Sequence, residues 1–305
     1  MRWATGFGKT NVDLLYGGMP RVPEEGEEIY ARSFSMQLGG GAPATLINLG
    51  RLNVPCRIQT LLGTDGFSEF AQKEFLKNGV SPRNLYTGTK MPINLTCAVI
   101  TPRDRAFTSY TDPVAITDDM MQEVLSCSRG ASLVMMHEGF LPIYPELKRA
   151  GAILLCDFGW KSGMSIEKMR GVLEQADWYT PNDKEAMALT GTDSPSAAAR
   201  VLAEFFDTVV IKLGAGGCLL YRRGQETIVP ALPNVHAVDT TGAGDAFLAG
   251  FMYGLYHGAP PETCALYGNI TGGACVKAVG CLASYVNEEE LLKEAEELKK
   301  AAGRA

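Results

Sequence analysis

The chain has 305 residues, of which 46% are hydrophobic and 20% are charged, a balance typical of a globular protein and not of a disordered one. Its formal net charge of −6 argues against nucleic acid or anionic membrane partners, because both need clustered lysine and arginine. The sequence has neither an apolar run long enough for a membrane span nor a secretory signal pattern, so we expect a soluble, cytoplasmic protein.

Short apolar runs alternate with helical patterns along most of the chain. Expected strands lie at 57–63, 131–136, 151–157 and 207–214, and expected helices lie at 67–79, 144–150 and 165–176. Strand and helix alternation of this kind predicts a parallel sheet covered by helices on both faces. We therefore expect a single α/β domain over residues 1–305.

Two segments depart from this alternation. Residues 11–38 and 92–113 alternate apolar and polar residues around turn signals, which is typical of half-exposed antiparallel strands. They could form a small lid sheet, or they could be ordinary edge hairpins of the main sheet.

The stretch AVDTTGAGDAF, residues 237–247, precedes a predicted helix that begins near Gly244. Unpaired backbone N–H groups of Gly242, Ala243 and Gly244 at this helix start would attract an anion. Asp245 would repel a bound phosphate, yet it could take a proton from an attacking hydroxyl. Alternatively, Asp245 only complements the helix dipole.

Two further helix starts carry candidate site residues. Gly40 and Gly41, ahead of Pro43, form a tight turn that could lie against a ligand or simply begin a helix. Asn182 and Glu185, three residues apart, could hold Mg²⁺ through oxygen atoms. The same pair also fits a capping box, in which each side chain caps the backbone of the other.

Five segments in chain order resemble the PfkB (ribokinase-like) carbohydrate kinases. They are GGGAPATLINLGRL at 39–52, GTDGFSEFAQKEFLKNGV at 63–80, TPNDKEA at 180–186, IKLGAGGCLLY at 211–221 and DTTGAGD at 239–245. The resemblance implies a three-layer αβα sandwich with a mostly parallel central sheet and a small β lid. It also implies ATP-dependent phosphorylation of a hydroxymethyl group on a small sugar or sugar derivative, with a possible homodimer through the lid.

By this resemblance each site residue has an expected role. Asp245 is the base, and Gly242, Ala243 and Gly244 form the anion hole. Asn11, Asp13, Gly40 and Gly41 contact the substrate, and Lys212, Gly214, Gly217 and Asn269 contact ATP. Asn182 and Glu185 bind Mg²⁺, whereas Asp239, Thr241 and Ser284 bind a monovalent cation such as K⁺.

The sequence departs from the family pattern on the acceptor side. Thr45, a candidate substrate contact, stands where many relatives have a sugar-binding asparagine, and Asp157, Trp160 and Lys161 stand in place of an Asp-x-Asn-x-Arg element. Trp160 could stack on a substrate or fill the core. His137, at the end of an expected strand, is a further candidate for substrate contact. The sugar therefore stays open, with a nucleoside kinase or an inactive sugar-sensing relative as alternatives.

Eight cysteines lie in apolar surroundings and form no Cys-x-x-Cys pair. We expect inert thiols in a reducing cytosol, the alternative being a redox pair of Cys275 and Cys281.

Overall fold

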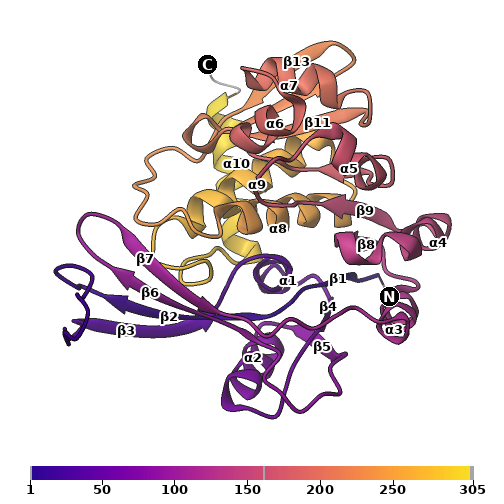
Figure 1. Ribbon diagram of the computed structural model, residues 1–305. Helices are drawn as coiled ribbons and strands as arrows, with labels where there is room; N and C mark the ends of the chain where they lie inside the picture. The colour runs from indigo at the N-terminus through magenta and orange to yellow at the C-terminus, as the bar shows by residue number, and fades with distance from the viewer. Residues whose placement is uncertain (1, 161, 303–305) are drawn as a thin grey trace.

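The computed structural model describes residues 2–160 and 162–302. Its main sheet has six parallel strands in the order β10-β9-β8-β1-β4-β5 (Figure 1). These are β1 (Ala4–Phe7), β4 (Cys56–Thr60), β5 (Val80–Asn84), β8 (Leu133–Met135), β9 (Ile153–Cys156) and β10 (Trp178–Tyr179). The expected parallel sheet is confirmed.

Three antiparallel strands extend this sheet beyond β10. They are β11 (Thr208–Lys212), β12 (Cys218–Arg222) and β13 (Gln225–Val229). An isolated parallel bridge between Asn182 and Lys212 joins β11 to the segment that follows β10, and the Lys212 amide donates to the Pro181 carbonyl at 2.8 Å. The bridge brings Lys212, at the carboxyl end of β11, next to Asn182, which directly precedes the helix that starts at Asp183.

Helices cover both faces of the sheet, as expected for three αβα layers (Figure 1). One layer holds α1 (Ala42–Arg51), α2 (Gly66–Lys77), α8 (Ala243–Tyr256), α9 (Pro261–Cys275) and α10 (Glu288–Ala302). The other holds α3 (Asp118–Ser128), α4 (Tyr144–Arg149), α5 (Ile166–Leu173), α6 (Asp183–Thr190) and α7 (Pro195–Leu202). Short 3₁₀ turns lie at Glu138–Ile143 and Gly214–Gly216. In β9, Leu155 packs toward the first layer and Leu154 and Cys156 toward the second, because successive strand residues point to opposite faces.

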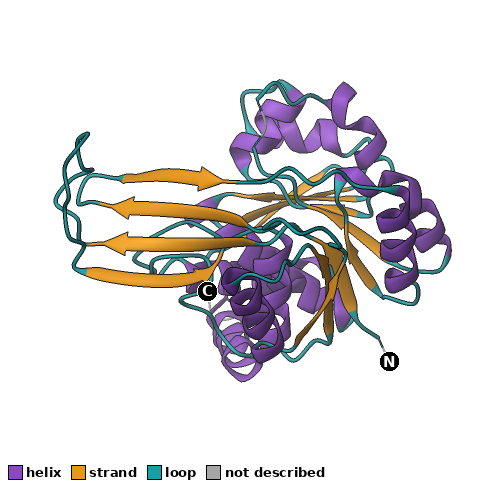
Figure 2. Cartoon of the chain, turned by 60° about the horizontal axis from the view of Figure 1, so that its bottom comes forward, coloured by secondary structure: helices purple, strands orange, loops and turns teal. Residues whose placement is uncertain are grey.

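A separate four-stranded sheet projects from one side of the body (Figure 2). Its strands, in the order β3-β2-β6-β7, are β3 (Ser33–Leu38), β2 (Asn11–Gly17), β6 (Asn94–Ile100) and β7 (Arg105–Tyr110). We call it the small sheet. Its separation from the main sheet rules out the alternative of edge hairpins.

The expectation of antiparallel strands was wrong for the centre of the small sheet. The β2–β3 and β6–β7 pairs are antiparallel, but β2 and β6 are parallel, with Asn11 opposite Asn94. Both strands leave the body at the same point, where the Asn94 amide donates to the Thr10 carbonyl at 3.0 Å. The outgoing strands of the two hairpins, β2 and β6, are neighbours, so they pair in parallel.

Within residues 2–160 and 162–302, no helix combines the length and apolar composition that a membrane crossing requires.

Candidate active site

The start of α8 is fixed by a glycine in the left-handed region. Gly242 has φ 78°, and a Cβ built on it would lie 2.1 Å from Cβ of Cys281. A side chain here would be strained and would also collide with the segment that follows α9. The helix then begins with the Ala246 amide donating to the Gly242 carbonyl at 2.9 Å. The expected helix start near Gly244 is confirmed.

Asp245 lies against the glycine turn before α1. Its Oδ2 accepts a hydrogen bond from the Gly41 amide at 3.0 Å, and a Cβ built on Gly40 would lie 2.7 Å from the same oxygen. Two motifs that are 204 residues apart therefore meet at one carboxylate.

The electrostatic surroundings of Asp245 favour its protonated form. Burial raises the pKa of Asp245 to about 7; the Gly41 hydrogen bond and the charge of Lys212 act against this shift, whereas the nearby carboxylates of Asp157 and Glu185 reinforce it. A carboxyl group with a pKa near neutrality can both accept and release a proton under physiological conditions.

Lys212, predicted to contact ATP, lies beside the first turn of α8. Its Nζ forms an ion pair with Asp157 Oδ2 at 2.8 Å, and both side chains are largely buried. The same Nζ lies 3.1 Å from the position of a Cβ built on Gly244. A positive charge therefore lies beside the first turn of α8, where the sequence predicts an anion site.

The predicted anion hole is only partly open. The Ala243 amide donates to the Thr240 carbonyl at 3.3 Å, so this donor is already engaged. Gly242 and Gly244 stay predicted donors, since the first amides of a helix have no partner four residues earlier within it.

Asn182 and Glu185 form the capping box that their spacing allowed. The Glu185 amide donates to Asn182 Oδ1 and the Asn182 amide donates to Glu185 Oε2, each at 2.9 Å. Glu185 is 7% exposed, and burial raises its pKa. The box holds the Glu185 carboxylate where the charge of Lys212 lowers its pKa and the charge of Asp157 raises it.

The Glu185 carboxylate suits Mg²⁺ that binds together with a nucleotide. In the described parts of the chain, no group of three or more His, Cys, Asp or Glu residues could hold a metal alone. Mg²⁺ in nucleotide sites needs only one or two protein carboxylates, since phosphates and water supply its other ligands. The second carboxylate oxygen of Glu185, Oε1, is not used in the capping box and fits that requirement, whereas Asn182 Oδ1 already accepts the Glu185 amide.

Asn11 and Asp13 lie at the base of the small sheet on the other side of the glycine turn. Asn11 Nδ2 donates to Asp13 Oδ1, and Thr96 Oγ1 donates to Asn11 Oδ1 at 3.2 Å. A Cβ built on Gly39 would lie 2.4 Å from Nδ2 of Asn11. Asn11 and Asp13 thus lie next to the glycine turn that contains Gly40, and burial raises the pKa of Asp13.

The other acceptor-side candidates differ in their exposure and in their contacts. Thr45 is fully buried within α1, so this conformation gives it no surface for a substrate. His137 packs edge-on against Phe7, with ring centroids 5.0 Å apart, and its Nδ1 accepts from the Gly139 amide at 3.1 Å. Trp160 is 62% exposed, so the alternative that it fills the core was wrong. Lys161 lies outside the described residues.

The nucleotide-side candidates lie in the turn between β11 and β12 and on α9, and both regions contact the end of β13. Asn269 is buried, and its Nδ2 donates to the carbonyls of Val229 and Pro230 at 2.9 Å each. Gly217 has φ 88°, and its Cβ would lie 2.1 Å from the Val229 carbonyl oxygen. Gly214 has φ 57° in the preceding turn. Their contact with ATP stays a prediction.

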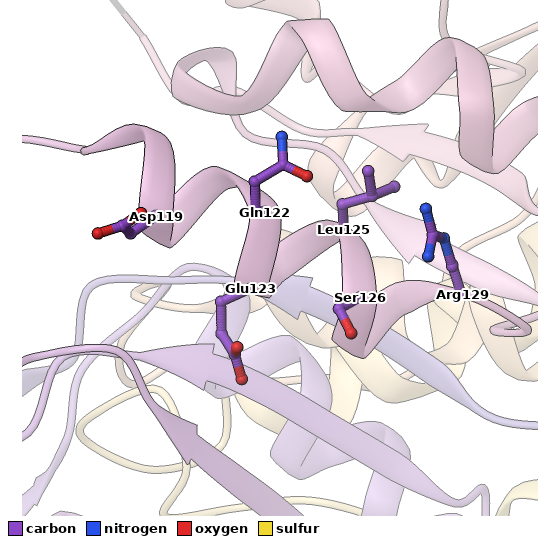
Figure 3. Close-up of a pocket in the computed structure, with 6 residues that line it drawn as sticks. All are labelled: Asp119, Gln122, Glu123, Leu125, Ser126 and Arg129. Carbon is purple, nitrogen blue, oxygen red and sulfur yellow. The ribbon is translucent and has the colours of Figure 1, made fainter.

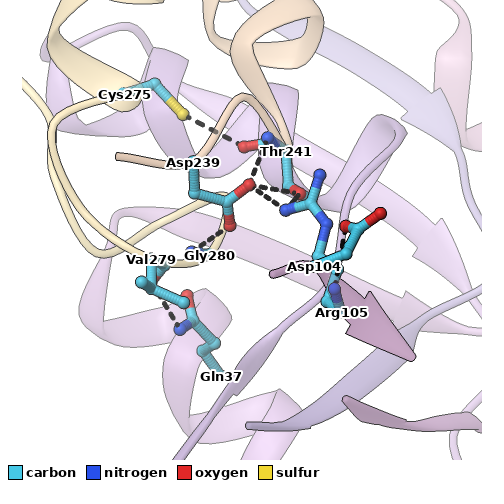
Figure 4. Close-up of polar contacts among 8 residues, drawn as sticks. All are labelled: Gln37, Asp104, Arg105, Asp239, Thr241, Cys275, Val279 and Gly280. Carbon is cyan, nitrogen blue, oxygen red and sulfur yellow. Dashed lines mark hydrogen bonds and ion pairs between the residues drawn. The ribbon is translucent and has the colours of Figure 1, made fainter. Parts of the chain in front are cut away.

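Asp239 is enclosed by hydrogen-bond donors (Figure 4). Its Oδ1 accepts from the Thr241 amide at 2.9 Å, from Thr241 Oγ1 at 2.7 Å and from Arg105 Nη1, and its Oδ2 accepts from the Gly280 amide at 2.9 Å. Burial alone would raise the pKa of Asp239, but the donors outweigh burial and lower it to about 2. This carboxylate is therefore ionised at every physiological pH.

The residues around Asp239 do not fit a monovalent cation. Both carboxylate oxygens already accept N–H donors, and Arg105 Nη1 also lies 2.7 Å from Thr241 Oγ1. None of the contacts that the structure describes for Asp239 or Thr241 involves Ser284, whose predicted role stays untested. Arg105 was missed by the sequence reasoning, because a single arginine beside a hairpin turn carries no local signal for a partner 134 residues away.

The cysteines are free thiols, and six of the eight are buried. Burial raises the pKa of the Cys275 thiol to about 12, and its Sγ donates to the carbonyls of Thr241 and Cys281. A thiol held neutral in this way is a poor redox group.

A surface pocket elsewhere lies along α3 (Figure 3). It is lined by Asp119, Gln122, Glu123, Leu125, Ser126 and Arg129. Ion pairs flank it, from Arg83 to Glu123 at 2.7 Å and from Arg129 to Glu146 at 2.8 Å. None of the motif residues lines this pocket, so it is not part of the candidate site.

Known proteins resemble this chain in sequence and in fold. The sequence profile of the pfkB family carbohydrate kinases matches residues 7–288. The ribokinase of Arabidopsis thaliana is 26% identical over 94% of this chain and 79% of its own length, and the fructokinase of Klebsiella pneumoniae is 29% identical over 91% and 92%. A solved structure of a putative ribokinase II from E. coli, in complex with ATP and Mg²⁺, has a TM-score of 0.80 at 20% identity and covers 97% of this chain and 100% of its own. The chain therefore belongs to the pfkB family and is a carbohydrate kinase.

Proposed function

We propose that this kinase transfers the terminal phosphoryl group of ATP to a hydroxymethyl group of a small sugar or sugar derivative, with Asp245 as base. The observation that carries the proposal is the position of Asp245 at the start of α8, bonded to the Gly41 amide and with a pKa near 7. The sugar oxygen bonds to the terminal phosphorus, the bond to ADP breaks, and the hydroxyl proton passes to Asp245.

Charge on the transferring group is stabilised at the start of α8. The amides of Gly242 and Gly244 are the proposed donors, with Ala243 contributing only if it releases Thr240. One such donor contributes about 3 kcal/mol to the transition state. Lys212 supports this role, since its ammonium group lies next to Gly244.

Magnesium binding is assigned to Glu185 and Asn182. Mg²⁺, when bound with ATP, would neutralise charge on the phosphates. The capping box supports the proposal because it fixes the Glu185 carboxylate near Lys212 without using its second oxygen in the contacts described. Lys212, Gly214, Gly217 and Asn269 stay the proposed nucleotide-side residues.

The acceptor binds between the small sheet and the glycine turn. Asn11, Asp13, Gly40 and Gly41 are its proposed contacts, with His137 and Trp160 at the periphery. The relatives named ribokinase and fructokinase support a small sugar as the substrate, but their names give different sugars. We propose that the small sheet acts as a lid that excludes water, within one kinase domain.

Exposed aromatic residues on the small sheet support a homodimer through this lid. Phe34 is 59% exposed, Phe107 56% and Tyr110 51%. These residues lie on the two edge strands of the small sheet, β3 and β7, and large apolar side chains left exposed on a surface are candidates for a protein interface.

We also propose a cytoplasmic location. Eight free cysteines suit a reducing compartment, where thiols stay unpaired.

The test is a panel of sugars and ribonucleosides. Thermal shift with an ATP analogue identifies ligands that stabilise the folded protein. Each stabilising compound is then assayed for ADP release with ATP and Mg²⁺. Activity with a free sugar above every ribonucleoside supports the proposal. Higher activity with a ribonucleoside favours a nucleoside kinase, and binding of a sugar without turnover favours a sugar-sensing protein.

A further inference from the structure

The hairpin tip of the small sheet contacts the segment that precedes α8. Arg105 is the first residue of β7, directly after the turn at 101–104. Its guanidinium group contacts Asp239 Oδ1 and Thr241 Oγ1 (Figure 4). A groove lies between the hairpin turn, residues 100–105, and the loop before α8, residues 237–240. The Arg105 side chain bridges this groove from the hairpin to the loop.

The bridge is a partly buried ion pair. The Asp239 side chain is 8% exposed and the Arg105 side chain is 32% exposed. Hydrogen bonds between charged groups are stronger than neutral ones, and low exposure limits screening by salt. Phe107 packs beside the guanidinium group, with its ring centroid 5.7 Å from Cζ.

The guanidinium group satisfies the same oxygens that the family resemblance assigned to a monovalent cation. Asp239 and Thr241 are two of the three predicted cation ligands, and each has an oxygen in contact with Arg105 Nη1. Arginine carries one permanent positive charge and directs it through fixed N–H donors. Arg105 therefore already supplies the positive charge, and the contacts to Asp239 and Thr241, that a bound cation would provide.

We propose that Arg105 replaces the monovalent cation, so that the kinase needs no potassium. The inference rests on the proposed function, and it makes Arg105 a positioning residue. Its charge holds the loop Asp239–Thr241 immediately before Gly242, and so orders the amides at the start of α8. Because Arg105 belongs to the small sheet, the order of the anion site depends on the hairpin being in place.

The first experiment measures phosphorylation rate against KCl at fixed ionic strength, with choline chloride as the balancing salt. The wild-type rate should change less than about twofold, since Arg105 already contacts Asp239 and Thr241. In Arg105→Ala the turnover number without K⁺ should fall at least about tenfold, because Asp239 loses a charged partner. Added K⁺ or low guanidinium concentrations should restore most of the rate. Arg103→Ala, an exposed arginine of the same hairpin turn, is the matched control and should behave as wild type.

The second experiment needs no substrate and therefore separates this inference from the proposed function. The unfolding temperature of each protein is measured in KCl and in choline chloride. Arg105→Ala should gain a few degrees specifically from K⁺, because bound cation stabilises the folded state, whereas wild type and Arg103→Ala should not. If Arg105→Ala fails to fold, Arg105→Gln takes its place.

Three results would overturn the inference. One is a wild-type rate that rises more than about tenfold with K⁺. Another is an Arg105 variant as active as wild type without K⁺. The third is a folded Arg105 variant whose lost activity and unfolding temperature respond to neither K⁺ nor guanidinium.

Discussion

Replacing Asp245 by asparagine isolates its role as the proton acceptor. The two side chains have nearly the same shape, and the asparagine oxygen can still accept the Gly41 amide that lies 3.0 Å from Oδ2. The glycine turn and the start of α8 should therefore keep their geometry. What the variant loses is the carboxylate that receives the hydroxyl proton.

The expected loss in turnover follows from this single change. A positioned base contributes a factor of about 10² to 10⁴, equivalent to about 3 to 5 kcal/mol in the barrier. Asp245→Asn should thus lower kcat at least about a hundredfold. Its affinity for ATP should stay nearly unchanged, since Glu185, Lys212 and the α8 amides are intact.

The assay is ADP release with ATP, Mg²⁺ and the best acceptor, together with calorimetric titration of ATP. Asp65→Asn is the matched control, because Asp65 caps α2 by accepting from the amides of Phe67 and Ser68, and asparagine caps equally well. A turnover number in Asp245→Asn within a few-fold of wild type would refute the assignment of the base.

The pKa of Asp245 gives the same variant a second signature. The folded-state pKa is about 7 and the ordinary value is 3.8, so between these values the folded protein binds more protons than the unfolded chain. The free energy of unfolding is therefore larger at low pH, where Asp245 is protonated, and it falls as pH rises toward 7 and the buried carboxyl group must ionise. Asp245→Asn should unfold at a higher temperature than wild type above about pH 7, with the difference shrinking toward pH 4. An unchanged difference across this range would contradict the raised pKa.

Three more substitutions test the surroundings of the base. Lys212→Met removes a charge that lowers the pKa of the base, so the acid limb of kcat/KM against pH should move to higher pH; an unmoved limb would count against their coupling. Glu185→Gln keeps a side chain that suits a capping box, so it should lose little stability, but it removes the carboxylate and should raise the Mg²⁺ concentration for half-maximal rate. The control Glu290→Gln, in the similar box of α10, should change neither stability nor the Mg²⁺ requirement. Gly242→Ala should destabilise by about 3 kcal/mol or more in urea unfolding, because strain adds to a clash. Gly191→Ala, at φ 67° in open space, should lose only about 1 kcal/mol, and equal losses would argue against the clash.

The layered fold could be predicted from the sequence because its signal is local. Uninterrupted apolar runs such as 153–156 indicate strands covered on both faces, and each lies beside a helical pattern. Pairing between strands is not local. The parallel match of Asn11 with Asn94 depends on where two distant hairpins leave the body, and alternation of residues carries no record of that.

The candidate site divides in the same way. The glycines around Asp245 are visible in the sequence because their conformation restricts which residue can stand there. The spacing of Asn182 and Glu185 allowed both a metal site and a capping box, and only the structure could show that the box forms. Arg105 had no signal, since its meaning comes from a contact between a hairpin tip and a distant loop.

The most direct test is product analysis of the purified protein with ATP, Mg²⁺ and the sugar panel. Mass spectrometry and ³¹P NMR would follow ADP and any phosphorylated sugar. Phosphoryl transfer to a hydroxymethyl group predicts equimolar ADP and one sugar monophosphate, dependent on both substrates and nearly absent with Asp245→Asn. ADP release at the same rate without any sugar, or formation of the sugar phosphate at the wild-type rate by Asp245→Asn, would contradict it.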